Sequence, residues 1–378
     1  MSQRYFATTI PGFEVELADE VNALGGRKIE KTTGGVEFSA THRVFYRALY
    51  ELRCANRVYL RLDEFRARDF PELYRKTRRY QWERLLGADN RVFVKGVAHE
   101  SHLMHSDRIA ETVAHGLREH YEDDLKVDAP QIVDKLDAAT QLVLARISDD
   151  RCQLSLDAAG EHLYKRGWRQ HPVEAPIRES TAAALLIRSG WTHRRALVDP
   201  FCGSGTFLVE GAWISSKRAP GDMREFAFQR WTNFRQPLWD DVVKIAQKRT
   251  HSCEGVRFYG FDADPDAVQA ARKNVELAKV GDCTEIRQAD ISEFVPPCDS
   301  KGMVIANPPY GERLTQGSGP RKAYQILIER FAEHFQGWRL GLLLPSDITP
   351  EHPRLRFKED IRFQNGGIRV RFWLARHR

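Results

Sequence analysis

The run Asn307-Pro308-Pro309-Tyr310 could bind an amine attached to an aromatic ring, because its residues have suitable types in a suitable order. Such an amine is a poor nucleophile because its lone pair is delocalised into the ring. The amide oxygen of Asn307 and the carbonyl oxygen of Pro308 can accept its two N–H bonds, which directs the lone pair at an incoming methyl group. Two successive prolines place these acceptors in advance, and Tyr310 can stack on the ring, a contact worth roughly 1–3 kcal/mol in single-strand binders. The run predicts methylation of an exocyclic amine on a base, although four residues alone could be only a turn.

A second segment, Asp199-Pro-Phe-Cys-Gly-Ser-Gly-Thr206, follows an apolar stretch and begins with an acid. Gly203 and Gly205 let the backbone approach a ligand closely, and the helix predicted after them offers free N–H groups at its start. A dinucleotide fingerprint would need Gly or Ala at its third position, which is Leu208 here, and the phosphate-loop pattern is absent. The segment therefore predicts a ligand-binding turn of another kind.

A third segment, Arg257-Phe-Tyr-Gly-Phe-Asp262-Ala-Asp264-Pro265, again ends a predicted strand on an acid. A carboxylate in that place can accept hydrogen bonds from both ribose hydroxyls of a nucleoside. The alternative is that both acids cap a helix, and Asp264, with Pro265 at the first helical position, fits that alternative. Because the Asn-Pro-Pro-Tyr run follows these two segments in order, we interpret Asp262 as a ligand-binding residue.

These segments lie on a pattern of short apolar strands and longer helices, which is typical of a parallel α/β sheet. Asn365-Gly366-Gly367 predicts the turn of a final hairpin. The strands that we expect are Arg195–Asp199, Arg257–Asp262, Thr284–Ala289, Gly302–Ala306 and Arg339–Leu344.

The N-terminal part has a different pattern. Residues 1–60 alternate strands and helices as a small α+β unit does, and the next hundred residues repeat that style, with a helix predicted over Asp69–Arg84. Within that helix, Arg75–Trp82 interleaves basic and aromatic residues, as a surface that follows phosphates and stacks bases would. A solvated helix face whose aromatic residues pack inward explains this run equally well. Tyr164–Pro176 has no periodicity and predicts a linker.

Composition and charge limit the kind of protein. The chain has 378 residues and a net charge of +6, which gives modest support to a polyanionic partner. No apolar run reaches the roughly 18–20 residues of a bilayer span, and no signal peptide is visible, so we expect a cytoplasmic protein without membrane contact. The cysteines have no zinc spacing and predict neither a disulfide framework nor a metal site: Cys54, Cys152, Cys202, Cys253, Cys283 and Cys298.

The order of the three segments resembles class I methyltransferases that methylate amino groups. Arg166-Gly-Trp-Arg169 and Glu174-Ala-Pro-Ile-Arg-Glu-Ser-Thr-Ala-Ala-Ala-Leu185 resemble the entry to the catalytic domain of THUMP-containing methyltransferases, most closely the guanine-N2 half of the bacterial large-subunit (23S) rRNA enzymes. The likeness extends over essentially the whole chain and is weaker over residues 1–157. It implies a ferredoxin-like domain at 1–60, a THUMP RNA-binding domain at 61–157, a linker at 158–176 and a Rossmann-like catalytic domain at 177–378.

The same resemblance implies S-adenosylmethionine as the cofactor and no metal. Asp262, with Ala263 beside it, would hold the ribose, and Asp290 with Ile291 would meet the adenine. Asn307 would contact both the cofactor and the target base, which Pro308, Pro309 and Tyr310 would also hold. The remaining cofactor contacts would be Glu179, Ser180 and Thr181 near its amino-acid end, and Asp199, Pro200, Phe201, Cys202, Gly203, Gly205 and Thr206 around its methionine part.

The resemblance implies transfer to N2 of a guanine in RNA, with ribosomal RNA as the first candidate and transfer RNA as a serious alternative. The Asn-Pro-Pro-Tyr run also occurs in DNA adenine and protein glutamine methyltransferases. An alternative of a different class is an RNA-binding module whose methyltransferase fold has lost its activity. We expect a monomer, and because the chain ends soon after one catalytic domain, we expect no fused second methyltransferase.

Two further segments are noteworthy. Ala219–Arg249 is an insertion rich in Trp, Phe and Arg that separates the glycine turn from Asp262, and the sequence does not give its role. Arg354–Arg378 is basic, and it either touches RNA or forms an amphipathic hairpin whose long cationic side chains reach solvent.

Overall fold

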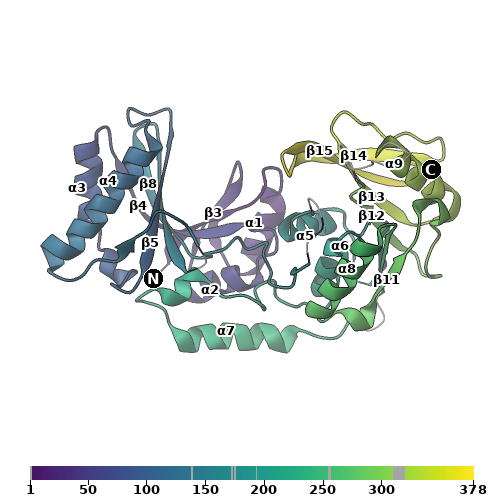
Figure 1. Ribbon diagram of the computed structural model, residues 1–378, viewed down its shortest axis with the longest axis horizontal. Coiled ribbons are helices and arrows are strands. Elements are labelled where there is room, and N and C mark those ends of the chain that lie inside the picture. Colours follow the sequence, from purple (N-terminus) through teal and green to yellow (C-terminus); the bar gives the residue numbers. More distant parts are fainter. Residues whose placement is uncertain are drawn as a thin grey trace. The chain divides into compact units, whose positions relative to one another are not determined.

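The computed structural model describes residues 2–137, 139–171, 173, 176–192, 194–253, 257–309 and 320–378. The chain divides into two compact units. The first comprises Met1–Thr9, Ala18–Leu163 and Arg224–Lys244, and the second comprises Ile10–Leu17, Tyr164–Met223 and Ile245–Arg378. Each unit contains one large sheet with helices packed on it (Figure 1).

The sheet of the first unit has eight strands in the order β2-β3-β1-β4-β8-β7-β5-β6. It is mixed, because β5 runs parallel to both β6 and β7 whereas the other neighbours are antiparallel. Its strands are β1 (Gln3–Thr8), β2 (Arg27–Thr32), β3 (Gly35–Ala40), β4 (Arg57–Arg66), β5 (Arg91–His99), β6 (Gln131–Ile132), β7 (Thr140–Ser148) and β8 (Arg151–Asp157). The helices of the N-terminal part are α1 (Glu14–Ala23), α2 (His42–Glu51), α3 (Phe70–Arg78) and α4 (Ser106–Glu119), and a π-helical turn, His120–Leu125, follows α4.

Side-chain caps fix the starts of two of these helices. Thr41 accepts a hydrogen bond from the Val44 N–H at the start of α2, and Asp69 accepts one from the Glu72 N–H at the start of α3. The helix predicted over Asp69–Arg84 is shorter than expected, because α3 ends at Arg78. The indole of buried Trp82 donates to the Thr77 carbonyl, which caps the last turn of α3 and turns the chain into a short 3-10 helix.

The insertion between the glycine turn and Asp262 is built largely into the first unit. Phe228 lies 4.7 Å from the ring of Tyr46 on α2, measured between ring centroids, and 5.3 Å from Trp239. Gln141 on β7 donates to the Ala227 carbonyl and accepts from the Trp231 indole. Residues 224–244 therefore supply part of the core of the N-terminal unit. Helix α7 (Gln236–Arg249) begins in this segment, and its residues from Ile245 on are assigned to the second unit.

The sheet of the second unit has seven strands in the order β11-β10-β9-β12-β13-β15-β14. The first five in this order are parallel, β15 is antiparallel to β13, and β14 and β15 form the hairpin that Asn365-Gly366-Gly367 predicted. Its strands are β9 (Ala196–Asp199), β10 (Phe258–Asp262), β11 (Thr284–Gln288), β12 (Gly302–Ala306), β13 (Arg339–Pro345), β14 (Leu355–Asn365) and β15 (Ile368–His377).

Helices cover both faces of this sheet. Leu197 and Phe258 face Gly211 of α6 (Thr206–Ser215), where an added Cβ would lie 2.7 Å from Leu197, so this close packing needs glycine. Val198 points to the opposite face and joins the core formed with α9 (Pro320–His334). The other helices are α5 (Glu179–Arg188) and α8 (Pro265–Leu277). Within the described ranges no helix is long and apolar enough to cross a membrane.

The insertion gives a test of the first unit. Phe228→Ala removes a buried ring from the cluster around Tyr46 and should lower the free energy of unfolding by about 3–5 kcal/mol, as measured by urea denaturation. Phe234→Ala is the control. The Phe234 ring lies 5.4 Å from that of Phe228, between ring centroids, but Phe234 is only half-buried, so this substitution should lower the free energy of unfolding by a clearly smaller amount. Equal, small effects of both substitutions would mean that the insertion is not part of this core.

Candidate active site

The three segments predicted to do chemistry meet at the carboxyl edge of the parallel strands. Asp199 is the last residue of β9, Asp262 is the last residue of β10, and Asn307 directly follows β12. β9 lies between β10 and β12, so these three strand ends are neighbours. The strand order reverses at β9, and α/β sheets bind ligands at such switch points.

The turn after β9 is held against the end of β10 by two hydrogen bonds. The Gly203 N–H donates to Asp262 Oδ2 over 2.9 Å, and the Cys202 N–H donates to the Phe261 carbonyl over 2.9 Å. Gly203 has a φ of +51°, and a Cβ there would lie 3.3 Å from Val173 Cγ2. Gly205 has a φ of +83° and caps α6. The turn therefore needs its glycines, and it places the start of α6 close to Asp262.

Asp199 is buried beneath this turn and accepts a hydrogen bond from the Phe201 N–H over 3.1 Å. Burial raises the pKa of Asp199 to about 8; the hydrogen bond from Phe201 opposes the rise, and the charge of Asp262 adds to it. Burial also raises the pKa of Asp262. A buried acid, Asp199, beside a half-buried one, Asp262, favours a ligand that carries positive charge, since such a charge stabilises their ionised forms.

A cavity of about 290 Å³ lies beside the turn, and its lining includes Pro200, Phe261, Asp290, Ile291 and Phe294. Asp290 accepts hydrogen bonds from the Ser292 N–H (2.8 Å) and hydroxyl (2.6 Å), and the bond from the hydroxyl lowers the pKa of Asp290. Ala263, next to Asp262, accepts a hydrogen bond from the Gln288 amide. The lining combines apolar walls with the polar side chains of Arg287, Gln288, Asp290 and Glu293, and such a cavity suits a flat heterocycle that bears an amino group.

Asn307 presents an unsatisfied acceptor at the end of β12. Its Oδ1 is buried and has no hydrogen-bond partner among the described residues. A buried acceptor left unsatisfied costs about 1–3 kcal/mol, so this position suits a ligand with an N–H donor. Pro308 is buried and Pro309 is half-buried, whereas Tyr310 lies outside the described residues.

The start of α5 carries a second group of unsatisfied atoms. Glu179 Oε2 and Thr181 Oγ1 are buried without a partner in the described part of the chain, and Ser180 is buried between these two residues in the sequence. Burial raises the pKa of Glu179 to about 7, although the nearby Arg169 opposes the rise. These residues therefore form a polar, largely dry group at the start of a helix, where a bound amino acid could exchange hydrogen bonds.

Arg169 connects this group to the glycine turn. This role of Arg169 was not predicted from the sequence. Its Nη2 donates to Thr206 Oγ1 (2.7 Å) and to the Ile177 carbonyl (2.9 Å), and its Nε lies 3.5 Å from Glu179 Oε1. A guanidinium between two helix starts adds positive potential where a carboxylate would bind. The only signal in the sequence was its place in the Arg166-Gly-Trp-Arg169 run, and Arg166 forms a fully buried ion pair with Glu210.

Family comparisons agree with this geometry. Residues 166–357 match the model described as the RMKL-like methyltransferase domain, residues 4–59 match an RlmL ferredoxin-like domain, and residues 67–157 match a THUMP domain. The chain belongs to the RMKL-like methyltransferase family. The predicted fold class, an α/β methyltransferase domain after ferredoxin-like and THUMP domains, is therefore confirmed, and S-adenosylmethionine is the cofactor.

Similar proteins extend the match over nearly the whole chain. A ribosomal RNA large subunit methyltransferase K/L of Syntrophotalea carbinolica is 32% identical over 97% of this chain and 53% of its own length. The chain thus spans about half the length of that curated relative. A putative RNA methyltransferase of Synechocystis, slr0064, is 30% identical over 96% of this chain and 94% of its own length. The crystal structure of SMU.472, a putative methyltransferase complexed with SAH, is 27% identical with a TM-score of 0.87, and the match covers 100% of this chain and 98% of that one.

The residues at the carboxyl edge fit the cofactor of this family. The unpaired atoms at the start of α5, the glycine turn and the cavity beside Asp290 form one continuous series of elements around the ends of β9, β10 and β11. Buried Asp199 suits a positively charged part of the ligand, and the carboxylate of Asp262 suits the ribose hydroxyls. The contacts of the individual residues with the cofactor stay predictions.

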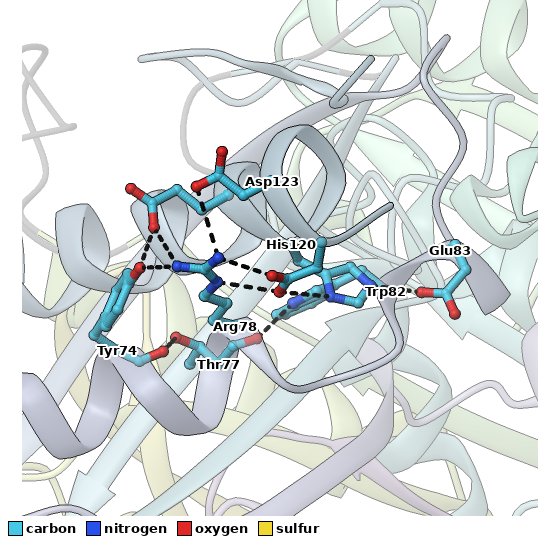
Figure 2. A network of polar contacts seen from close by, with 9 residues as sticks. Tyr74, Thr77, Arg78, Trp82, Glu83, His120 and Asp123 are labelled. Carbon is cyan, nitrogen blue, oxygen red and sulfur yellow. Dashed lines mark hydrogen bonds and ion pairs between the residues drawn. The ribbon is translucent and has the colours of Figure 1, made fainter. Parts of the chain in front are cut away.

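In the THUMP domain the basic and aromatic run Arg75–Trp82 divides into two parts, and Figure 2 shows the first of them, around Arg78 and Trp82. Arg78 is neutralised by acids, with its Nη1 at 3.0 Å from Glu119 Oε2 and its Nη2 at 2.7 Å from Asp124 Oδ1, and Trp82 is buried. These two residues serve the fold, as the second interpretation of the run predicted. By contrast, Lys76 and Arg79 of this run, with Arg84 just after it, are exposed and line a cavity of about 310 Å³.

Asp199 gives a pH-dependent test. Its folded pKa lies above that of an unfolded aspartate, near 4, so the ionised carboxylate destabilises the protein progressively as pH rises from about 4 through about 8. Without cofactor, Asp199→Asn should therefore gain stability relative to the wild type between pH 5 and pH 8.5, by on the order of a few kcal/mol, in urea unfolding. Asp290→Asn is the control and should show no such gain, because the pKa of Asp290 is lowered. If the difference in unfolding free energy between Asp199→Asn and the wild type did not change with pH, the raised pKa of Asp199 would be excluded.

Proposed function

We propose that this chain transfers a methyl group from S-adenosylmethionine to the exocyclic N2 of a guanine in RNA, with the 23S RNA of the large ribosomal subunit as the first candidate. The observation that carries the proposal is the buried Oδ1 of Asn307 at the end of β12, which has no hydrogen-bond partner in the described part of the chain. An exocyclic amine is a ligand that this acceptor can bind. Asn307 lies at the same carboxyl edge of the sheet as Asp199 and Asp262, where we expect the cofactor to bind.

The residues act by placement. Bound S-adenosylmethionine supplies a methyl group that is already activated by the positive sulfur. Asn307 accepts one N–H of the target amine and the Pro308 carbonyl accepts the other, which turns the nitrogen lone pair away from the ring and toward the methyl group. Because the two prolines restrict the backbone, these acceptors need little reorganisation in the transition state. The base must leave its stack to reach them, at a cost of a few kcal/mol unless it is already unpaired.

The amine-binding pair does not by itself distinguish guanine from adenine, since N2 of one and N6 of the other are both exocyclic amines. Support for guanine comes from the likeness to the guanine-N2 half of the large-subunit enzymes, and support for RNA comes from the THUMP domain and from the names of the relatives. Transfer RNA is the principal alternative substrate, because a THUMP domain recognises structured RNA in general.

The role of Asn307 can be tested against that of Asp262. Asn307→Ala removes the amide acceptor and should lower kcat by about 10²–10³-fold, as loss of a preorganised hydrogen-bond partner does in other enzymes. Its Kd for S-adenosylmethionine, measured by calorimetry, should stay within about threefold because most cofactor contacts remain.

Asp262→Ala is the matched control and should weaken cofactor binding first, since it removes the acceptor that holds both the Gly203 N–H and the ribose. Equal losses of cofactor binding in both variants would indicate that Asn307 supports the fold rather than the target amine.

The division of the basic run in the THUMP domain gives a second test. The exposed cations Lys76, Arg79 and Arg84 should contact phosphates, so replacing all three by Ala should weaken RNA binding and reduce the magnitude of its salt dependence by as much as about 2–3 in slope. Arg78→Ala is the control. It should lower thermal stability, because it leaves Glu119 and Asp124 unpaired, but it should leave the salt dependence of RNA binding unchanged. If Arg78→Ala reduced the salt dependence of RNA binding and the triple substitution did not, the RNA would instead bind on the side of the run that faces α4.

The substrate is identified by methyl transfer from labelled S-adenosylmethionine to total RNA from cells that lack this enzyme, followed by nucleoside analysis. Labelled N2-methylguanosine in 23S RNA is the expected result. The same nucleoside in transfer RNA would change the substrate only, and labelled N6-methyladenosine would refute the guanine assignment. Cofactor binding without label in any RNA or ribosomal precursor would favour the inactive RNA-binding alternative.

A further inference from the structure

Two cysteines line one cavity at the amino edge of the second sheet, opposite the candidate active site. Cys253 follows α7 and precedes β10, and Cys283 directly precedes β11. β10 and β11 are parallel neighbours in which Phe258 pairs with Thr284, so Cys283 lies at the amino edge of the sheet beside the start of β10. The cavity has a volume of about 600 Å³, and both cysteines belong to its lining.

Hydrogen bonds hold the two segments in place. The His251 N–H donates to the Ser216 carbonyl (3.0 Å), and the Cys253 thiol contacts the Ala212 carbonyl (3.4 Å), so this segment is attached to the end of α6. Arg257 Nη1 donates to the Asp282 carbonyl over 2.9 Å and joins the entry of β10 to that of β11. Both cysteines therefore lie on anchored segments that line the same cavity.

The thiols also interact with each other. A hydrogen bond from Cys283 lowers the pKa of the Cys253 thiol to about 7; burial opposes this effect, and Ser216 and His251 support it. The same interaction raises the pKa of Cys283. Arg257 and Lys279 line the cavity as well and favour negative charge on sulfur. Arg218 is paired with Asp222 over 2.8 Å, and Asp282 is a second acid in the lining. Cys253 is half-exposed, so a small reagent can reach it.

We propose that Cys253 and Cys283 are a site of reversible oxidation by peroxides, in which they form an intramolecular disulfide. The Cys253 thiolate attacks one peroxide oxygen, the O–O bond breaks, and a sulfenic acid and one molecule of water result after proton uptake. The Cys283 sulfur then attacks the sulfenic sulfur, the S–O bond breaks and a second molecule of water leaves. Overall, two thiols are oxidised to one disulfide and one peroxide is reduced to two waters, and a dithiol reductant reverses the change.

Cys283 is itself buried, and the remaining cysteines differ from Cys253, the thiol that reacts first. Cys54, Cys152 and Cys202 are buried, and burial raises the pKa of Cys152 to about 12 and that of Cys202 well above its ordinary value. Cys298 is half-exposed like Cys253, but its sulfur contacts Ser300 rather than a second cysteine. In the described ranges no cluster of three or more His, Cys, Asp or Glu side chains could hold a metal ion. The inference is independent of the RNA substrate.

The test uses the full reduced chain treated with hydrogen peroxide. Intact mass spectrometry should show the loss of two hydrogen atoms, peptide mapping should assign the bond to Cys253 and Cys283, and dithiothreitol should restore the original mass. Cys253→Ser and Cys283→Ser should each abolish the mass loss, whereas Cys298→Ser, the matched control, should retain it. Thermal unfolding of each variant verifies that it is folded. A mass loss that persists in Cys253→Ser, or a bond to any other cysteine, would overturn the proposal.

A second measurement does not depend on the serine variants. Alkylation of Cys253 in the wild type by iodoacetamide should be half-maximal near pH 7, as the Cys283 hydrogen bond requires, rather than near the value of about 8.5 for an ordinary cysteine. Cys283 should become more reactive once Cys253 has been blocked. Ordinary behaviour of Cys253 in this assay would also refute the proposal.

Discussion

The hydrogen bond from the Gly203 N–H to the Asp262 carboxylate joins the turn after the first parallel strand to the end of the second, and the candidate site depends on it. It sets how closely the start of α6 approaches β10. It also uses only part of the hydrogen-bonding capacity of Asp262, because each carboxylate oxygen keeps a lone pair for a ligand. Pro200 and Phe261, which follow the paired residues Asp199 and Gly260, both line the adjoining cavity.

Around this bond the protein contains buried polar groups that do not stabilise the fold in the absence of a ligand. Buried Asp199, the unpaired oxygens of Glu179 and Thr181, and the unpaired oxygen of Asn307 all lie at helix starts or strand ends. Each lowers the stability of the unliganded fold, and each can be satisfied by one part of a nucleoside, an amino acid or a base. The same features that weaken the empty site therefore give it selectivity, and the compensating stability comes from packed elements such as α6 and the core beneath α9.

Local patterns in the sequence were sufficient for the parallel strands, the final hairpin, the caps at Thr41 and Asp264, and the gathering of Asp199, Asp262 and Asn307 at one edge, because short-range rules govern strands, turns and caps. They were insufficient where distant residues decide. The short exposed strand β2 has no apolar alternation, and the early end of α3 depends on Trp82. The role of Arg169 depends on Thr206, and the environment of Arg78 depends on acids more than forty residues away along the chain, at Glu119 and Asp124.

The insertion of residues 224–244 into the N-terminal unit has a consequence for how the chain is made. The ring cluster around Phe45 and Tyr46 stays open until Phe228, Trp231 and Trp239 have left the ribosome, and by then β9 and α6 of the second unit have already emerged. Co-translational folding therefore cannot complete the units strictly one after the other, although domains generally fold in order from the N-terminus. A fragment that stops in the linker would leave these rings exposed to water, as an apolar patch prone to aggregation.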